Sequence, residues 1–205
     1  MRFLVLKSGM FDANNYFLIN EESGEAVIID ACATYQNILK AQTEHGFIVK
    51  YALITHAHFD HTVSCYSLGE NGVKIYISEK DNKLLKTDKF LKKNATAGSR
   101  PFKGDVLLNG GGVLNLCGFD IKVIATPGHT AGSLCFLCGN KLFSGDTLFY
   151  NDIGRTDLPT GSERAIINSV KNVLFKLEGD YEVYPGHGES TTLDYERKNN
   201  GYVRG

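Results

Sequence analysis

The feature that most constrains this chain is a run of four potential metal ligands within six residues: His56, His58, Asp60 and His61. The run directly follows Ala52–Ile54, an apolar segment that predicts a buried strand, and precedes a segment compatible with a helix, 62–68. Imidazole and carboxylate groups are good ligands for zinc, iron and manganese. A turn at the end of a rigid strand can aim such side chains inward. The two histidines of the H-x-H pair can therefore meet one metal while the following Asp-His pair meets another.

Three further candidate ligands follow strand-like segments in the same way, each next to a glycine: His129, Asp146 and His187. Glycine and proline at these places suit tight turns. A lone histidine is more often a core or surface residue than a ligand, but five histidines and two aspartates at strand-to-loop junctions predict a metal site. The sixth histidine, His45, ends a predicted helix, where a cationic side chain is favourable, and is interpreted as structural.

Strand-like segments dominate the chain, and helices are few. Short apolar runs bounded by Gly, Asn, Asp or charged residues predict strands at Phe3–Leu6, Tyr16–Ile19, Ala26–Ile29, Ala52–Ile54, Val73–Ile77, Val106–Leu108, Ile121–Ile124, Ser133–Leu137, Lys141–Phe143 and Glu182–Tyr184. Amphipathic helices are predicted over Tyr35–His45 and from an N-cap at Ser162 to Gly179. Many strands with few helices favour an α+β fold of two packed sheets with helices on the outer faces.

Composition narrows the class of protein. With 205 residues, of which 42% are hydrophobic, the chain can bury a large core, and residues 1–205 are expected to form a single domain. The formal net charge of −1 provides no field that would recruit nucleic acid or an anionic membrane. No run approaches membrane-spanning or signal-peptide length, so a cytoplasmic protein without membrane attachment is expected.

The cysteines form an odd and scattered set at positions 32, 65, 117, 135 and 138. This distribution favours free thiols in a reducing compartment over a disulfide framework. Cys135 and Cys138 form a C-x-x-C, but their odd offset on a strand points them to opposite faces. They are therefore interpreted as small core residues.

Two glycine- or lysine-rich segments allow alternative interpretations. Gly110–Gly112 predicts a hairpin turn, because Val113 and Leu114 follow where a phosphate-binding loop needs Lys and Ser or Thr. The lysine-rich segment Lys83–Lys103 is interpreted as a solvated helix face that runs into a mobile loop. The alternative is an anion-attracting lid beside the site.

The motif H-x-H-x-D-H, followed by His, Asp and His in this order and spacing, resembles the metallo-β-lactamase fold superfamily. The likeness extends from Asn14-Asn15-Tyr16 and Ile29-Asp30 to Pro185-Gly186-His187-Gly188. The resemblance implies an αββα sandwich of two mixed β-sheets, with the site at one sheet edge. It implies that a first metal is bound by His56, His58 and His129. A second would be bound by Asp60, His61 and His187, with Asp146 bridging and Asp30 behind the ligands as their support.

The residue at the bridging position separates branches of this superfamily. Classical zinc β-lactamases have Cys or Ser there, whereas glyoxalase II-like thioester hydrolases and phosphodiesterase branches have Asp, so Asp146 speaks against β-lactamase activity. The segment 154–159 resembles short glyoxalase II-like hydrolases, and Arg155 falls where a basic residue helps to hold glutathione. Two features depart from the glyoxalase II pattern: Asp157 stands where that pattern tends to be aromatic, and no C-terminal helical substrate domain is expected.

The resemblance predicts a binuclear metallohydrolase. Two divalent ions, expected to be zinc with iron or manganese as alternatives, would lie roughly 3.5–4 Å apart and convert a shared water to hydroxide. The hydroxide would attack a thioester such as S-lactoylglutathione or a related small acyl thioester, with Asp60 orienting it and Asp146 bridging the metals. A thiolate leaves with little need of a general acid. The expected partner is thus a small molecule, which can be glutathione-linked.

Three other functions compete with this one. Persulfide dioxygenases of the same superfamily keep these seven residues but use a single iron, which would sit on His56, His129 and Asp146. A phosphodiesterase relative that processes RNA is motivated by the lysine cluster, but the length leaves no room for an RNA-gripping domain and the charge is balanced. A non-catalytic metal-binding scaffold is the third, although structural zinc sites are usually closed by four protein ligands. The sequence does not specify an oligomeric state.

Overall fold

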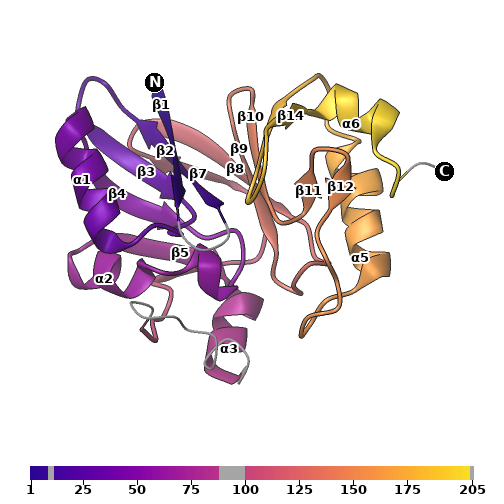
Figure 1. Cartoon of the computed structure of the whole chain (residues 1–205), viewed down its shortest axis with the longest axis horizontal. Helices are drawn as coiled ribbons and strands as arrows, with labels where there is room; N and C mark the ends of the chain where they lie inside the picture. The colour runs from indigo at the N-terminus through magenta and orange to yellow at the C-terminus, as the bar shows by residue number, and fades with distance from the viewer. Residues whose placement is uncertain (9–11, 88–99, 204–205) are drawn as a thin grey trace.

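Two six-stranded β-sheets lie face to face in the computed structural model, which describes residues 1–8, 12–87 and 100–203 (Figure 1). The first sheet contains, in spatial order, β1 (Arg2–Ser8), β2 (Ala13–Ile19), β3 (Glu25–Ile29), β4 (Ile48–Leu53), β5 (Lys74–Ser78) and β6 (Val106–Leu108). The second contains β14 (Thr191–Thr192), β13 (Glu182–Pro185), β10 (Lys141–Gly145), β9 (Leu134–Cys138), β8 (Phe119–Ala125) and β7 (Val113–Leu116). Both sheets mix parallel and antiparallel pairs.

Helices cover the outer face of each sheet. The first sheet is covered by α1 (Tyr35–His45), α2 (Cys65–Glu70) and α3 (Glu79–Thr87), and the second by α5 (Glu163–Asn168), the π-helix η2 (Ser169–Leu174) and α6 (Leu193–Asn199). A small ribbon, β11 (Leu148–Phe149) with β12 (Asp152–Ile153), lies beside the second sheet. The predicted αββα sandwich of the α+β class is confirmed. Among the described residues, no helix combines the length and the apolar composition needed to cross a bilayer.

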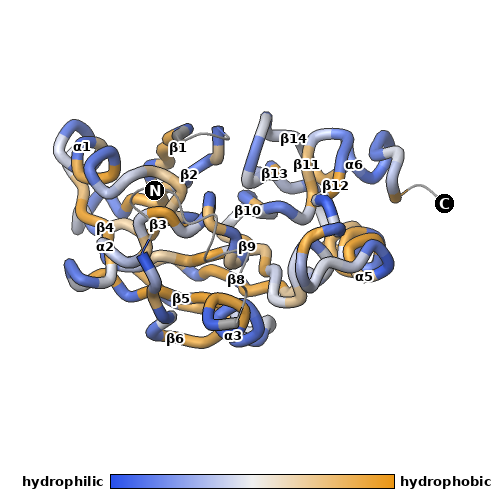
Figure 2. The backbone as a smooth tube through the Cα atoms, turned by 60° about the horizontal axis from the view of Figure 1, so that its bottom comes forward, coloured by the Kyte–Doolittle hydropathy of each residue, from blue (hydrophilic) through white to orange (hydrophobic). Residues whose placement is uncertain are grey.

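The three layers of core follow from the two-residue period of the strands. On β2, Phe17 and Ile19 pack against the helices of the first sheet, whereas Tyr16 and Leu18 point between the sheets. Because both faces are covered, the segment Tyr16–Ile19 of β2 is buried and apolar without interruption. Figure 2 shows hydrophobic colour along parts of β5, β8 and β9 in the middle of the sandwich. The apolar runs in the sequence therefore correspond to strands that are buried on two sides.

Strand direction brings the candidate ligands to one edge of the sandwich. In the first sheet β3, β4 and β5 are parallel, so their carboxyl ends lie at the same edge. In the second sheet β10 and β13 are parallel, and β8 has the same direction because β9 is antiparallel to both β8 and β10. Ligands in open sheets bind beyond the carboxyl ends of such strands, which is where the predicted site residues follow in the chain.

The structure corrects three expectations. Gly110–Gly112 does not form a hairpin, because β6 belongs to the first sheet and β7 to the second, so the turn carries the chain from one sheet to the other. The helix predicted to reach Gly179 starts as expected, with the Ser162 hydroxyl accepting a hydrogen bond from the Ala165 N–H, but changes to π-helical geometry at Ser169 and ends at Leu174. The helix-compatible segment 62–68 begins later, at Cys65.

Other expectations hold or fall outside the described residues. Cys135 contacts the layer under α5 and η2 while Cys138 faces the first sheet, so the C-x-x-C residues do point to opposite faces. The predicted loop or lid lies largely in residues 88–99, outside the described part of the chain. His45 ends α1 and belongs to none of the clusters of candidate ligands.

Candidate metal centre

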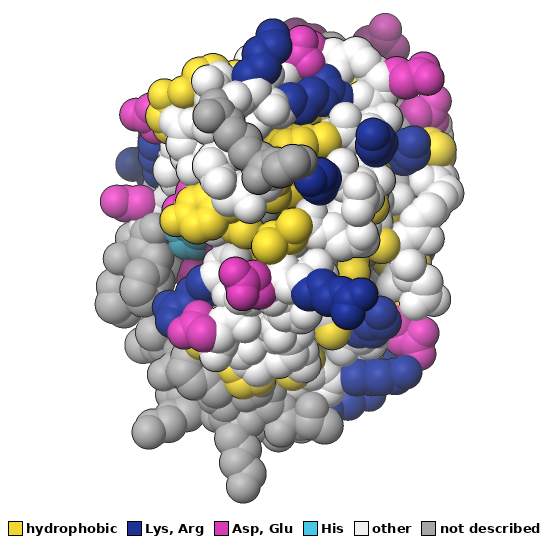
Figure 3. All heavy atoms as spheres, turned by 90° about the vertical axis from the view of Figure 1, so that its right-hand side faces the viewer, with side chains coloured by type: hydrophobic (Ala, Val, Ile, Leu, Met, Phe, Trp, Pro, Cys, Tyr) yellow, Lys and Arg dark blue, Asp and Glu magenta, His cyan; other side chains and the backbone are white. Residues whose placement is uncertain are grey.

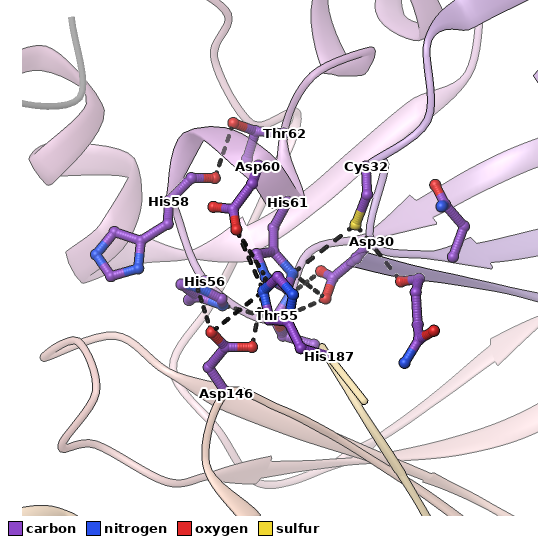
Figure 4. A network of polar contacts seen from close by, with 12 residues as sticks. Asp30, Cys32, Thr55, His56, His58, Asp60, His61, Thr62, Asp146 and His187 are labelled. Atoms are coloured by element: carbon purple, nitrogen blue, oxygen red, sulfur yellow. Dashed lines mark hydrogen bonds and ion pairs between the residues drawn. The ribbon is translucent and has the colours of Figure 1, made fainter. Parts of the chain in front are cut away.

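The loop after β4 carries four of the candidate ligands and is held by hydrogen bonds to its surroundings. The Ala31 N–H donates to the His61 carbonyl (2.9 Å), and the Thr62 hydroxyl donates to the His58 carbonyl (3.1 Å). A short 3-10 helix, η1 (Phe59–His61), turns the chain so that the Asp60 and His61 side chains face the same space as the preceding histidines (Figure 4). The buried strand thus fixes the backbone from which these ligands project.

The second sheet supplies the remaining three ligands, one after each of β8, β10 and β13. Gly186, next to His187, has no room for a side chain, because a Cβ there would lie 2.1 Å from Asp146 Oδ1 and 2.6 Å from His61 Cε1. The Gly186 carbonyl accepts a hydrogen bond from the Asn14 N–H (2.8 Å), which ties this turn to the start of β2 in the other sheet. The site therefore lies where the edges of the two sheets meet.

All seven predicted ligands are brought together. Three groups, each with ligand atoms within 4.8 Å of one another, consist of His56, His58 and His129; of His56, His61 and Asp146; and of Asp60, His61 and His187. His58 Nδ1 and His129 Nε2 are 2.8 Å apart, and His61 Nε2 and His187 Nε2 are 3.1 Å apart. The first and third groups reproduce the two ligand sets that the family resemblance implied.

Asp146 lies between the two outer groups. Its Oδ2 is 3.4 Å from His129 Nε2 and 3.7 Å from His187 Nε2, and its Oδ1 is 3.4 Å from His61 Nε2. One carboxylate thus faces members of both sets, and Figure 4 shows it below the other ligands, pointing up toward them. This is the arrangement required of a bridging ligand.

Hydrogen bonds behind the ligands select one tautomer for three imidazoles. Because a carbonyl oxygen can only accept, His129 Nδ1 carries the proton that it donates to the Arg155 carbonyl (2.7 Å), which leaves Nε2 facing the site. His61 Nδ1 lies 2.8 Å from Asp30 Oδ2, and His56 Nδ1 lies 3.0 Å from the Thr55 hydroxyl. The second nitrogen of each ring is thereby available to a metal.

Asp30 occupies the supporting position predicted from the sequence. It lies buried just after β3, and its carboxylate also accepts hydrogen bonds from the Thr55 N–H and the Thr55 hydroxyl, both at 2.8 Å. One side chain therefore positions two neighbours of the site, His61 directly and His56 through Thr55. Cys32, beside His61 in Figure 4, is buried, and burial raises the pKa of its thiol to about 12.

Burial and neighbouring charges shift the pKa values of four candidate ligands: His56, His58, Asp60 and His61. Burial and the neighbouring histidines lower the pKa of His56 and His58, in the second case to about 4. Burial opposes charge on His61, but Asp146 and the acidic groups around it raise its pKa well above the ordinary value. Burial also opposes ionisation of Asp60, yet His61 and His187 lower its pKa. The deprotonated forms that metals require are thus favoured for His56, His58 and Asp60.

The residues present fit divalent metal ions. His56 Nε2 and Asp146 Oδ1 are buried and have no hydrogen-bond partner among the described residues, although each faces other ligand atoms. Leaving such atoms without a partner is unfavourable, and a cation between them would satisfy both. Nitrogen and carboxylate donors of this kind suit zinc, iron or manganese.

A pocket of about 870 Å³ opens next to the ligands. It is lined by five of the candidate ligands, by polar residues that include Asp152 and Glu163, and by a set of apolar and aromatic residues: Phe149, Ile153, Leu158, Ile166 and Tyr202. Figure 3, which shows the side of the molecule that carries α5 and α6, has a histidine side chain visible beside hydrophobic ones. A small molecule can therefore reach the ligands, and part of it would contact an apolar wall.

Arg155, the predicted substrate-binding residue, lines this pocket, but its charge is already engaged. Its guanidinium donates two hydrogen bonds to the Asp157 carboxylate, at 2.7 and 2.6 Å. The pairing lowers the pKa of Asp157 to about 2, so the carboxylate stays charged at any ordinary pH. Asp157, noted as a departure from the glyoxalase II pattern, thus faces the residue that was expected to bind substrate.

Sequence reasoning missed two kinds of residue. The apolar pocket wall comes from the β11–β12 ribbon, α5 and the chain beyond α6, which are far apart in the sequence and carry no motif. Asp81, buried on α3, contacts the loops that bear the ligands. Its signal was available: it follows the end of β5 as closely as the first ligand follows the end of β4.

Comparisons with known proteins agree with this geometry. Residues 9–187 match the family model of the metallo-β-lactamase superfamily. The chain is 32% identical to a protein of Haemophilus influenzae named hydroxyacylglutathione hydrolase GloC, over 92% of each chain.

Two solved structures extend the comparison. BLEG-1, described as a B3 metallo-β-lactamase, is similar with a TM-score of 0.88 and 30% identity over 100% of both chains. TTHA1623, solved in a di-iron-bound form, gives a TM-score of 0.84 and 30% identity, over 97% of this chain and 99% of that one. The family and the fold are thereby shown by sequence and structure alike.

Proposed function

The chain belongs to the metallo-β-lactamase superfamily, and we propose that within it the protein is a binuclear metallohydrolase that acts on a small acyl thioester. The observation that carries the proposal is the convergence of seven ligands in two sets around Asp146, at the wall of an open pocket. The likeness to a protein named hydroxyacylglutathione hydrolase supports the thioester class. S-lactoylglutathione is the first substrate to test.

The first metal would be held by His56, His58 and His129, and the second by Asp60, His61 and His187, with Asp146 shared. When bound, the metals would activate a water at neutral pH and polarise the substrate carbonyl. Zinc is the expected ion, with iron or manganese as alternatives. The relative solved with two irons supports occupancy by two ions and keeps iron among the candidates.

Asp60 and Asp146 are the proposed catalytic carboxylates. Asp60 lines the pocket, and because His61 and His187 lower its pKa it is ionised and can accept a hydrogen bond from an attacking water, which orients the water toward the substrate. Asp146 faces both ligand sets and keeps them at a fixed separation. No nucleophilic serine or cysteine lines the pocket among the described residues, which is consistent with attack by water.

The thioester itself would lie between the ligands and the apolar residues of the pocket. The apolar side chains Ile153, Leu158 and Ile166 can bury the methylene groups of an acyl or thiol part, at roughly 0.8 kcal/mol for each methylene. Arg155 is the proposed contact for a carboxylate of a glutathione-linked substrate. To make that contact Arg155 must break its ion pair with Asp157, so the affinity that we propose for a substrate carboxylate at Arg155 is modest.

A mononuclear iron persulfide dioxygenase is the second candidate, favoured by a specific feature of the site. His129 Nε2 and His56 Nε2 lie 3.4 and 4.0 Å from the same oxygen of Asp146, which is a two-histidine, one-carboxylate set open to the pocket. β-Lactam hydrolysis is a further outcome to test, because BLEG-1 is described as a β-lactamase. The expectation that Asp146 excludes this activity stays a prediction.

One experiment separates these functions. The purified protein is analysed for metal content and assayed for release of thiol from S-lactoylglutathione, for oxygen uptake with glutathione persulfide, and for cleavage of a chromogenic β-lactam. Two metal equivalents with thioester hydrolysis are expected. One iron per chain with oxygen uptake would establish the dioxygenase instead, and β-lactam cleavage alone would refute the thioester proposal.

A further inference from the structure

Asp81 is a buried carboxylate that the proposed mechanism does not use. It lies on α3 and its side chain is only 1% exposed. Burial raises its pKa, while hydrogen bonds from Thr130 and the backbone of Ala57 oppose that effect. Because an acidic group in the interior is unfavourable unless it is hydrogen-bonded, its partners indicate what it stabilises.

Both partners belong to segments that bear ligands. The Ala57 N–H donates to Asp81 Oδ2 at 2.8 Å, and Ala57 lies between His56 and His58 in the chain. The Thr130 hydroxyl donates to the same oxygen at 2.9 Å, and Thr130 directly follows His129. A single carboxylate oxygen therefore connects the two segments that carry the group His56, His58 and His129, one segment from each sheet.

We propose that Asp81 is a positioning residue that holds these two segments at the separation at which their three histidines bind one metal ion. The inference rests on the proposed metal binding and adds a residue that is specific to the first ligand group. Asp30 has the corresponding place for the other group, where it contacts His61. Asp81 on α3 thus supports the first ligand group, whereas Asp30 at the end of β3 contacts the second group directly and reaches the first only through Thr55.

The surroundings of Asp81 restrict it to this position. Its N–H donates to the Ser78 hydroxyl (3.1 Å), and the Ser133 hydroxyl contacts Thr130 at both the N–H (3.0 Å) and the hydroxyl (2.9 Å). A Cβ on Gly132 would lie 2.2 Å from Asp81 Oδ1, so the turn after His129 packs directly onto the start of α3. These contacts fix Asp81 at the start of α3 and hold the Thr130 hydroxyl beside its carboxylate.

The test is chelator competition on the metal-loaded protein, with the metal retained per chain measured at each chelator concentration. Asp81→Ala removes both acceptor contacts. It should release one metal equivalent at roughly 10- to 100-fold lower chelator activity than the wild type, as expected for loss of a residue that orients ligands, while the other equivalent is unchanged. Thr130→Val removes one contact and should have a smaller effect in the same direction. Asp81→Asn keeps an oxygen that can accept both hydrogen bonds and should largely restore retention.

Asn82→Ala is the matched control. Asn82 is a neighbouring buried polar residue on α3, and its side chain accepts a hydrogen bond from the Gly104 N–H (3.0 Å), away from the ligands. This variant should retain both metals as the wild type does, even where it lowers the melting temperature. Combining Asp81→Ala with Asp30→Asn should weaken both equivalents, because each residue mainly supports a different group.

The outcomes distinguish this inference from the proposed function. Wild-type retention of both metals by Asp81→Ala and Thr130→Val, or an equal loss in Asn82→Ala, would overturn the positioning role and leave the proposed function standing. A wild-type protein that binds no metal would overturn both. Should Asp81→Ala fail to fold, Thr130→Val and Asp81→Asn decide the question by their order of metal retention.

Discussion

Replacing Asp30 by Asn should weaken one metal more than the other. In the native site the Asp30 carboxylate accepts three hydrogen bonds, from the Thr55 N–H, the Thr55 hydroxyl and His61 Nδ1. An asparagine of the same shape has one accepting oxygen and one donating NH₂. If the oxygen faces the Thr55 N–H, the NH₂ faces both the Thr55 hydroxyl and His61 Nδ1, and it forces the imidazole proton onto Nε2, the nitrogen that points into the site. If the amide is turned over, the NH₂ meets the Thr55 N–H.

Either orientation leaves a buried polar group without its partner, which costs about 1–3 kcal/mol. In the first orientation this free energy weakens metal binding, because Nε2 must lose its proton before it can bind the metal. At 1.4 kcal/mol for each factor of ten, the affinity of the metal held by Asp60, His61 and His187 should fall by about 5- to 140-fold. Asp30 reaches the metal of the other group only indirectly, through its hydrogen bond with the Thr55 hydroxyl and the contact of that hydroxyl with His56, so this metal should be weakened less.

Metal retained per chain during chelator competition measures this effect, and thioester hydrolysis measures its consequence. Ser64→Ala is a suitable control, because the Ser64 hydroxyl is buried in the same layer but donates only to the carbonyls of Ala31 and Ala33. Asp30→Asn should release one equivalent early and Ser64→Ala none. The tautomer reasoning is refuted if Asp30→Asn holds both metals as tightly as the wild type, or if both equivalents leave together.

Three further perturbations test other parts of the structure. Asp146→Ala should lower retention of both metals and reduce turnover at least about 100-fold, a larger effect than substitution of a residue that only orients ligands. Unchanged metal content and rate would disprove the bridging role of Asp146. Asp157→Asn should free Arg155 and lower the KM of a glutathione thioester by about two- to fivefold, a small change because exposed ion pairs are weak. The KM of a neutral thioester should not change, and equal changes for both substrates would exclude this role of Arg155. Phe136→Ala, fully buried between the sheets, should lower the free energy of unfolding in urea by about 3–5 kcal/mol, and a loss under 1 kcal/mol would contradict the assigned core.

The sequence predicted the sandwich because its strands are buried on both faces. Runs such as Tyr16–Ile19 and Ala26–Ile29 are apolar without interruption, and this pattern survives small errors in the assigned ends. The turn Gly110–Gly112 was misjudged because three glycines adopt a hairpin or a crossing between sheets equally well, and only the partner strands decide. The two-residue strands β11, β12 and β14 are too short to have a period.

The candidate ligands were predictable for a different reason. Each follows the end of a strand, so strand direction fixes its position in space. So many histidines and aspartates at strand ends are rare outside metal sites. The support from Asp81 and the ion pair of Arg155 with Asp157 depend on side-chain contacts that no spacing rule encodes. The single-domain organisation, the absence of a C-terminal helical domain, the cytoplasmic location and the lack of nucleic-acid or membrane partners stay predictions.

The number of metals decides between the hydrolase and the iron oxygenase, and the supporting contacts bear on that number. An enzyme with one iron on His56, His129 and Asp146 has no need for an oriented His61. Yet Asp30, buried and with a positive φ of 58° just beyond β3, fixes this ring with Nε2 toward the site, 3.1 Å from His187 Nε2. Asp and Asn tolerate that backbone region better than other non-glycine residues, so the strand end is adapted to hold the carboxylate there. A support that orients His61 as a ligand fits a second metal at this group, and the number of metals per chain tests it, because single-iron dioxygenases keep the same seven residues.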